Sequence, residues 1–144
     1  MSGRVVWDRL DPSLSVPVVD YDDGRYCQPL AAIRNGAHSG VYMICRDSRG
    51  REVLYVGESH SGRLYDTITR HFRQWKRRND PNGRRFGGVT YDRHAVRVCF
   101  VLADAGDVAD LQYGYIQALA PRDNVVDGSG VVELDDGGGD DLPV

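Results

Sequence analysis

The sequence predicts a small α/β domain in which helices flank a central three-stranded mixed sheet. Two short apolar runs, GVYMIC and EVLYV, are separated by DSRG, which is typical of a β-hairpin. A third apolar run, HAVRVCFVL (94–102), indicates another strand. One segment with helical spacing precedes this strand and another follows it. The expected order is therefore hairpin, helix, strand, helix.

The hairpin places two tyrosines in similar settings. If the turn is centred between Ser48 and Arg49, Tyr42 lies directly opposite Tyr55. Any loop with an even number of residues keeps the two on one face of the sheet, whereas a three-residue loop does not. Since a buried phenol needs a hydrogen-bond partner, two such residues on one face indicate chemistry and not simple packing.

The first helix is expected to run from about residue 62 to residue 78. Ser61 is a plausible N-cap, and apolar residues recur at helical spacing. These residues are Leu64, Ile68, Phe72 and Trp75. The sequence NDPNG (79–83) ends the helix.

The second helix is expected from about residue 107 to residue 120, with Asp104 or Asp107 as its cap and Pro121 after its end. Its apolar face contains one polar residue, Gln112. Two interpretations are open. Gln112 is either a satisfied core or edge amide, or a side chain that projects into a polar site on the sheet.

Outside this unit, we expect an N-terminal extension (1–38) and an acidic, disordered tail (127–144) around a domain of residues 39–126. Within the extension, VPVV (16–19) is a candidate edge strand and LAAIRNG (30–36) a candidate helical turn. Near the other end, VVEL (131–134) is a candidate short strand.

Charge is distributed unevenly along the chain, whose formal net charge is −3. The segment 127–144 carries six acidic residues and no Lys or Arg, whereas segment 63–85 carries eight basic residues and two acidic ones. A local cationic surface points to a polyanion such as DNA, although a solvated helix face is the alternative. The candidate nucleic-acid-binding residues are Arg73, Lys76, Arg77, Arg78, Arg84 and Arg85.

The three cysteines are widely spaced and form no CxxC motif, which argues against a disulfide framework or a zinc site. They are expected to be reduced and buried. The chain has no run of eighteen apolar residues, and its first residues lack a signal-peptide pattern. These features predict a cytoplasmic protein without a membrane partner.

Two motifs at hairpin spacing then suggest a family. Gly40-Val41-Tyr42 and Tyr55-Val56-Gly57, followed by an arginine-bearing helix, a strand, a helix and Pro121-Arg122-Asp123-Asn124, resemble the GIY-YIG nucleases over about residues 39–125. The resemblance implies a metal-dependent endonuclease that hydrolyses DNA phosphodiester bonds with Mg²⁺ or Mn²⁺. It also implies that Tyr42 acts as general base or orients the attacking water, that Tyr55 supports the phosphate, and that Asn124 braces the site.

The resemblance also implies an arginine on the first helix that holds the scissile phosphate. Arg63 precedes Leu64 as in the family, although two residues early, and Arg70, followed by His71, is the competitor. We prefer Arg63 because it is closer to the hairpin. Arg70 and His71 remain candidate catalytic residues.

One position departs from the family. Gln112 stands where the resemblance implies the metal-binding glutamate, and a neutral amide is a poor ligand for Mg²⁺. We therefore expect this chain to be an inactive Glu-to-Gln variant of a nuclease, through engineering or natural loss. The alternative is a non-catalytic nucleic-acid-binding module that keeps the nuclease fold. Cutting both strands requires two sites, so a homodimer is plausible.

Overall fold

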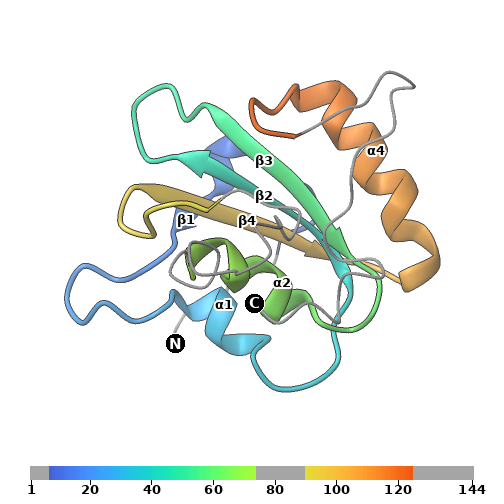
Figure 1. The fold of residues 1–144 in the computed structure, drawn as a ribbon, viewed down its shortest axis with the longest axis horizontal. Helices are drawn as coiled ribbons and strands as arrows, with labels where there is room; N and C mark the ends of the chain where they lie inside the picture. Colours follow the sequence, from blue (N-terminus) through green and yellow to red (C-terminus); the bar gives the residue numbers. More distant parts are fainter. Residues whose placement is uncertain (1–6, 74–89, 125–144) are drawn as a thin grey trace, which may run out of the picture.

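The computed structural model describes residues 7–73 and 90–124. Short helices lie between the strands of one sheet, except that β2 and β3 follow each other directly (Figure 1). In chain order the elements are η1 (Pro12–Leu14), β1 (Val16–Pro17), α1 (Gln28–Ala32), β2 (Gly40–Arg46), β3 (Val53–Ser59), α2 (Leu64–Thr69), η2 (Arg70–Phe72), β4 (Val96–Leu102), η3 (Ala105–Asp107) and α4 (Val108–Leu119), where η denotes a 3-10 helix. The predicted order of hairpin, helix, strand and helix is confirmed.

The sheet has four strands in the order β1-β4-β2-β3, and all of its pairings are antiparallel. The predicted three-stranded mixed sheet is therefore wrong. β3 and β4 run in the same direction, but both pair with β2, which lies between them, so no parallel pair forms. The fourth strand comes from the predicted edge strand at residues 16–19, which places part of segment 1–38 in the same sheet.

The hairpin register differs from the prediction by two residues of β3. Tyr42 lies opposite Gly57, and Tyr55 lies opposite Ile44. The register shifts between Ile44 and Cys45, which leaves Leu54 as an extra residue in β3. The tyrosines are thus diagonal neighbours and not direct partners. The prediction that they share one face is confirmed, since their ring centroids are 6.1 Å apart.

Gly40 and Gly57, the outer glycines of the two motifs, are both positions of close approach. A Cβ on Gly57 would lie 2.3 Å from the Tyr42 hydroxyl, and one on Gly40 would lie 2.1 Å from the Val101 carbonyl oxygen. Any side chain at Gly57 would displace the Tyr42 ring. The glycine beside the second tyrosine therefore fixes where the first tyrosine lies.

The first helix starts later than predicted. α2 begins at Leu64, the helix changes to the 3-10 form at Arg70, and Ser61 is not the N-cap. Gly62 has a φ of +80°, and its carbonyl accepts a hydrogen bond from His38 N (3.2 Å). Gly62, expected in the first turn of the helix, therefore has a non-helical conformation. The expected continuation to residue 78 lies outside the described residues.

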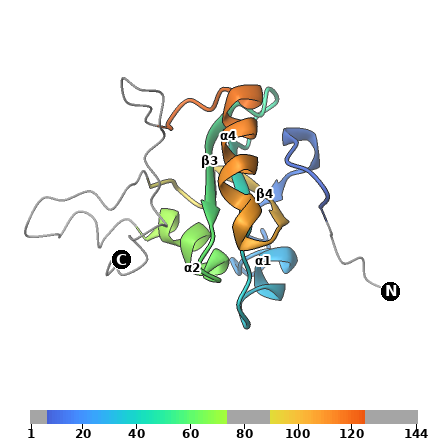
Figure 2. The same cartoon turned by 90° about the vertical axis from the view of Figure 1, so that its right-hand side faces the viewer.

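α4 agrees with the second predicted helix. Its N-cap is Asp107, and it ends at Ala120, which has a left-handed conformation (φ 49°) before Pro121. α4 packs mainly on β3 (Figure 2). The candidate strand at 131–134 and the acidic tail lie outside the described residues.

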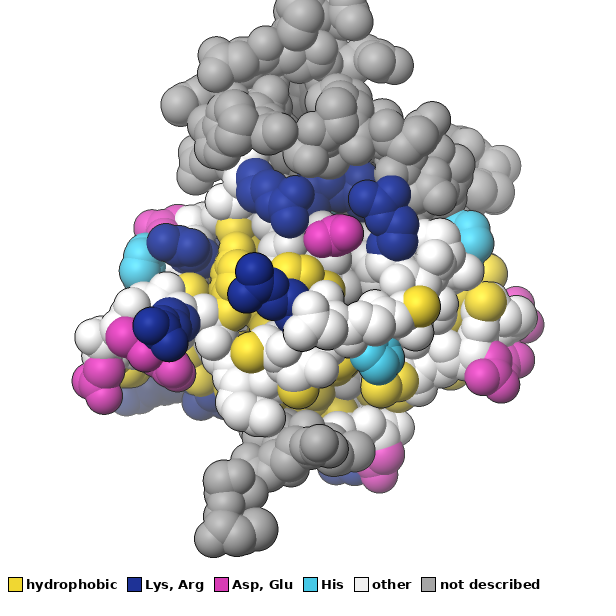
Figure 3. All heavy atoms as spheres, turned by 90° about the horizontal axis from the view of Figure 1, so that it is seen from below, with side chains coloured by type: hydrophobic (Ala, Val, Ile, Leu, Met, Phe, Trp, Pro, Cys, Tyr) yellow, Lys and Arg dark blue, Asp and Glu magenta, His cyan; other side chains and the backbone are white. Residues whose placement is uncertain are grey.

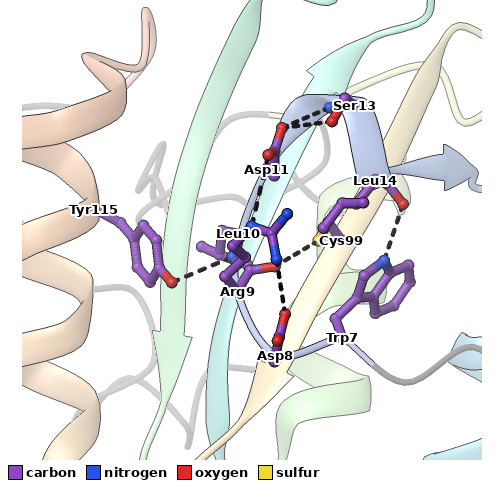
Figure 4. Close-up of polar contacts among 9 residues, drawn as sticks. All are labelled: Trp7, Asp8, Arg9, Leu10, Asp11, Ser13, Leu14, Cys99 and Tyr115. Carbon is purple, nitrogen blue, oxygen red and sulfur yellow. Dashed lines mark hydrogen bonds and ion pairs between the residues drawn. The ribbon is translucent and has the colours of Figure 1, made fainter.

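A segment near the N-terminus packs against the sheet and α4. Figure 4 shows this segment crossing in front of β2 and β4, with Tyr115 of α4 reaching it across β3. Leu10 N donates to the Tyr115 hydroxyl (3.3 Å), and Trp7 Nε1 donates to the Leu14 carbonyl (2.9 Å). The Trp7 ring also meets Phe100 edge-on, with centroids 4.9 Å apart. These contacts make the segment part of the core.

The three cysteines are free and buried, as predicted. Burial raises the pKa of Cys27 to about 11 and that of Cys99 to about 12, so neither is a thiolate near neutral pH. Among the described residues, no helix is long and apolar enough to cross a membrane.

Candidate functional site

A buried tyrosine–histidine pair lies at the centre of the candidate site. The Tyr42 hydroxyl is 2.7 Å from His71 Nε2, and both side chains are fully buried. The Tyr55 ring lies 4.7 Å from the His71 ring, centroid to centroid. β2, β3 and η2 thus bring together three of the catalytic residues suggested by the sequence. An imidazole within hydrogen-bond distance of a phenol is an arrangement that can accept a proton.

Tyr91 extends this cluster and was not expected from the sequence. Its ring lies 5.9 Å from that of His71, its N–H donates to the His71 carbonyl (2.8 Å), and its hydroxyl donates to Asp123 Oδ2 (2.8 Å). Tyr91 thereby connects η2 to the segment after α4. A tyrosine two residues before a charged turn carries no periodic signal, so sequence reasoning had no means of finding it.

Gln112 and Asn124 meet at the backbone of Val56, on the outer edge of β3. Asn124 Oδ1 accepts from Val56 N (2.9 Å) and its Nδ2 donates to the Val56 carbonyl (2.8 Å), as a neighbouring strand would. Gln112 Nε2 donates to the same carbonyl (3.3 Å), and its side chain is buried. Because Val56 follows Tyr55 directly, both amides brace the strand that carries the second tyrosine.

Of the two interpretations of Gln112, the structure agrees with a buried amide whose nitrogen is satisfied. Its other polar atom, Oε1, accepts no hydrogen bond from the residues that the structure describes. One neutral oxygen does not fit Mg²⁺, which favours charged carboxylate ligands. Within residues 7–73 and 90–124, moreover, no three His, Cys, Asp or Glu side chains gather as metal ligands do. The donors that the described residues offer at this position therefore do not fit the divalent metal that the family resemblance implies.

The candidate arginines lie in two different environments. Arg63, the N-cap residue of α2, is 45% exposed in its side chain and lies 3.8 Å from Asp66. Arg70 is buried and directly precedes His71. Arg73 donates to Thr69 Oγ1 (3.1 Å) and also lies 3.8 Å from Asp66. Arg63 is thus accessible to a ligand from solvent, whereas Arg70 belongs to the buried interior near His71.

The surface over α1 and α2 carries several arginines (Figure 3). Burial raises the pKa of Tyr65, and the nearby Arg34 and Arg73 oppose that shift. Arg93 lies 5.9 Å from the centroid of the Tyr26 ring. Cations interleaved with aromatic rings suit the phosphates and bases of a nucleic acid. The other predicted DNA-binding residues, Lys76, Arg77, Arg78, Arg84 and Arg85, lie outside the described residues.

A further titratable pair lies at the end of β3 and was not expected from the sequence. Glu58 is almost completely buried, and both of its carboxylate oxygens lie 3.1 Å from His60 Nδ1. Glu58 directly follows the second motif, Tyr55-Val56-Gly57. In the sequence, Glu58 is only a charged residue near the end of an apolar strand. That position alone does not tell whether its side chain is buried or solvated.

Comparisons of the chain with protein-family models, with curated proteins and with solved structures gave no match.

Proposed function

We propose that this domain is an endonuclease of the GIY-YIG type that hydrolyses DNA phosphodiester bonds, with a weakened or inactive site in this chain. The single observation that carries the proposal is the buried contact between Tyr42 and His71. A free phenol titrates near pH ~10 and is a poor base at neutral pH. The proposal requires that water reaches this buried oxygen when substrate binds. With an imidazole 2.7 Å away, Tyr42 can then take a proton from the water and pass its own proton to His71 Nε2.

The positions of the other site residues suggest their roles in the proposed reaction. Tyr55 lies against the His71 ring and supports the phosphate, and the accessible Arg63 stabilises charge on the phosphoryl oxygens. Asn124 holds the backbone of Val56, and so keeps Tyr55 in place. In this proposal Arg70 is a positioning residue, because it is buried beside His71.

We assign the use of Mg²⁺ or Mn²⁺ to a form of the protein with glutamate at position 112, because the amide present here does not fit the ion. The present geometry also suits an amide better than a carboxylate. A glutamate oxygen in place of Gln112 Nε2 would lie 3.3 Å from the Val56 carbonyl oxygen, and two acceptors would then face each other. A cation between them, or a rotated side chain, would relieve this repulsion.

The Gln112→Glu variant tests the proposal. We expect it to nick supercoiled plasmid in Mg²⁺ or Mn²⁺, and we expect the unmodified chain to nick slowly or not at all. Adding Tyr42→Phe to this variant should abolish nicking, whereas adding Tyr113→Phe, on an exposed face of α4, should not. The proposal fails if Gln112→Glu produces no cleavage, or if Tyr42→Phe leaves cleavage unchanged.

The same variant gives a second measurement that does not depend on turnover. Without metal, Gln112→Glu should unfold at lower urea concentration, because a buried group without a partner costs about 1–3 kcal/mol. Added Mg²⁺ or Mn²⁺ should restore stability in Gln112→Glu and leave the unmodified chain unchanged. Equal stability of Gln112→Glu with and without the ion would show that the introduced glutamate does not bind the metal.

A non-catalytic nucleic-acid-binding module is the second candidate. The fit of the Gln112 amide to the Val56 carbonyl favours it, because that hydrogen bond is made without a metal and residues 7–73 and 90–124 contain no cluster of metal ligands. This candidate predicts salt-dependent DNA or RNA binding with no cleavage in Gln112→Glu. The nicking assay therefore decides between the two functions.

A further inference from the structure

The Glu58–His60 pair joins a buried carboxylate to an accessible imidazole. The Glu58 side chain is 1% exposed and the His60 side chain is 42% exposed, although Nδ1 lies 3.1 Å from both carboxylate oxygens. Burying a carboxylate is costly unless it is paired with a donor or a positive charge. Whatever else Glu58 contacts, a carboxylate 3.1 Å from an imidazole nitrogen favours the protonated ring, and the exposure of His60 shows that this ring extends from the interior toward the surface.

The turn that presents His60 is held by hydrogen bonds on both sides. Gly62 N donates to Ser39 Oγ (3.1 Å), and Arg63 N donates to Ser59 Oγ (3.2 Å). The positive φ of Gly62 suits glycine, and its carbonyl is held by His38 N. A side chain on such a turn loses little further conformational freedom when it binds a ligand.

The same turn connects the strand of Tyr55 to the accessible Arg63. Gly57, three residues before His60, lies opposite Tyr42. Because a strand advances roughly 3.3 Å per residue, His60 lies within about 10 Å of that pairing along β3. Two groups suited to phosphate, His60 and Arg63, thus lie in the turn that follows the strand of Tyr55.

We propose that Glu58 holds His60 as an imidazolium that binds a phosphodiester group of a nucleic acid, beside the phosphate held by Arg63. In this pair His60 contacts the ligand through Nε2, and Glu58 is a positioning residue. The inference rests on the nucleic-acid partner of the proposed function and does not require cleavage.

Charged groups on neighbouring elements could also affect how DNA binding depends on pH. They are Arg63 and Asp66 of α2, His38 before β2, and Asp104 and Asp107 before α4. His38 is the one histidine among these five side chains, and histidine is the side-chain type that most often acts as a switch near neutral pH. His38 is therefore the group that a test of His60 must control for.

The test is binding of a short fluorescent DNA duplex, followed by anisotropy between pH 5.5 and 8.5 in EDTA. Affinity of the unmodified chain should fall several-fold as the pH rises and His60 loses its proton. His60→Gln should remove most of this fall and reduce the salt slope of binding by roughly one phosphate contact. Glu58→Gln should move the fall to lower pH, because the carboxylate no longer favours the protonated ring.

The matched controls are His38→Gln, on the neighbouring segment, and His94→Gln, on a distant one. Each removes another histidine and should keep the pH dependence. NMR of the unmodified chain adds a readout that needs no variant, since the His60 ring signals should shift when the duplex is added. The inference is overturned if His60→Gln binds as His94→Gln does, or if the His60 signals do not respond to DNA.

These outcomes separate the inference from the cleavage proposal. DNA binding that depends on His60, together with no nicking by Gln112→Glu, would overturn the catalytic proposal alone. Nicking by Gln112→Glu, together with binding that ignores His60, would overturn the phosphate contact alone. Absence of DNA binding by the folded chain would overturn the inference outright.

Discussion

Two buried regions of this domain satisfy their polar groups in different ways. Around His71, one side chain pairs with another, since the Tyr42 hydroxyl meets an imidazole nitrogen. Near the N-terminus, side chains pair with the backbone, as Trp7 does with the Leu14 carbonyl and Tyr115 with Leu10 N. A backbone partner cannot change its charge, whereas an imidazole can. The first region is therefore suited to chemistry and the second to holding the sheet and α4 together.

We expect the greatest loss of stability from a substitution in the N-terminal region. Trp7→Ala removes a nearly buried ring that packs on Phe100 and donates to Leu14. We expect a loss of about 3–5 kcal/mol in the free energy of unfolding, measured by urea denaturation. Tyr21→Ala, at an exposed position, is the control and should change stability by less than about 0.5 kcal/mol. Equal stability of the two variants would show that the segment does not belong to the core.

A substitution beside His71 should cause the second-largest loss of stability. Tyr42→Phe keeps the ring but removes the hydroxyl bonded to a fully buried imidazole. We expect a loss of about 1–3 kcal/mol in unfolding free energy, because His71 Nε2 loses this bond in an interior site. The exposed Tyr113→Phe should be neutral by the same measurement. A Tyr42→Phe variant as stable as the unmodified chain would contradict the buried hydrogen bond.

A smaller loss of stability is expected when the N-terminal region loses one hydrogen bond. Tyr115→Phe removes one partly buried hydrogen bond to Leu10 N, and should cost about 1 kcal/mol or less. It should leave DNA binding unchanged at every pH, because this contact holds the backbone and carries no titrating group. A change in the pH dependence of DNA binding in Tyr115→Phe would remove the functional distinction between the two regions.

The smallest effect concerns Asp123, which lies at the edge of the His71 region. A hydrogen bond from Arg122 and a further one from Tyr91 hold the pKa of Asp123 below its ordinary value of 3.8. A lowered pKa adds stability that is present well above pH 3.8 and is lost as the pH falls through the lowered value. Because Arg122 is exposed, the contribution should be below about 1 kcal/mol.

Urea denaturation of the unmodified chain and Asp123→Asn checks this sign. The variant should be slightly less stable at pH 7, and the difference should shrink near pH 3. A difference that grows as the pH falls would contradict the assignment of the stabilising charge to Asp123.

Local patterns predicted several elements correctly because their causes are local. The β-branched and aromatic runs became β2, β3 and β4, and the spacing of apolar residues with Pro121 bounded α4 closely. The shared face of Tyr42 and Tyr55 followed from the two-residue period of a strand. The direct pairing of the tyrosines failed for two reasons. The pair nearest the turn, Cys45 with Val53, is already one residue away from the predicted register, and Leu54 then adds one more residue in β3. A bulge leaves no clear sign in composition.

Which residue types are available to the site follows from the order of amino acids alone: two motif tyrosines, an amide at position 112 where the resemblance implies a carboxylate, and Asn124 after α4. The tertiary structure decided their partners. It placed β4 beside β2, brought His71 to Tyr42 and both amides to Val56, and buried Glu58 against His60. The physical reason is that strand order and side-chain pairing depend on contacts between distant segments, whereas periodicity and capping depend on neighbours along the chain.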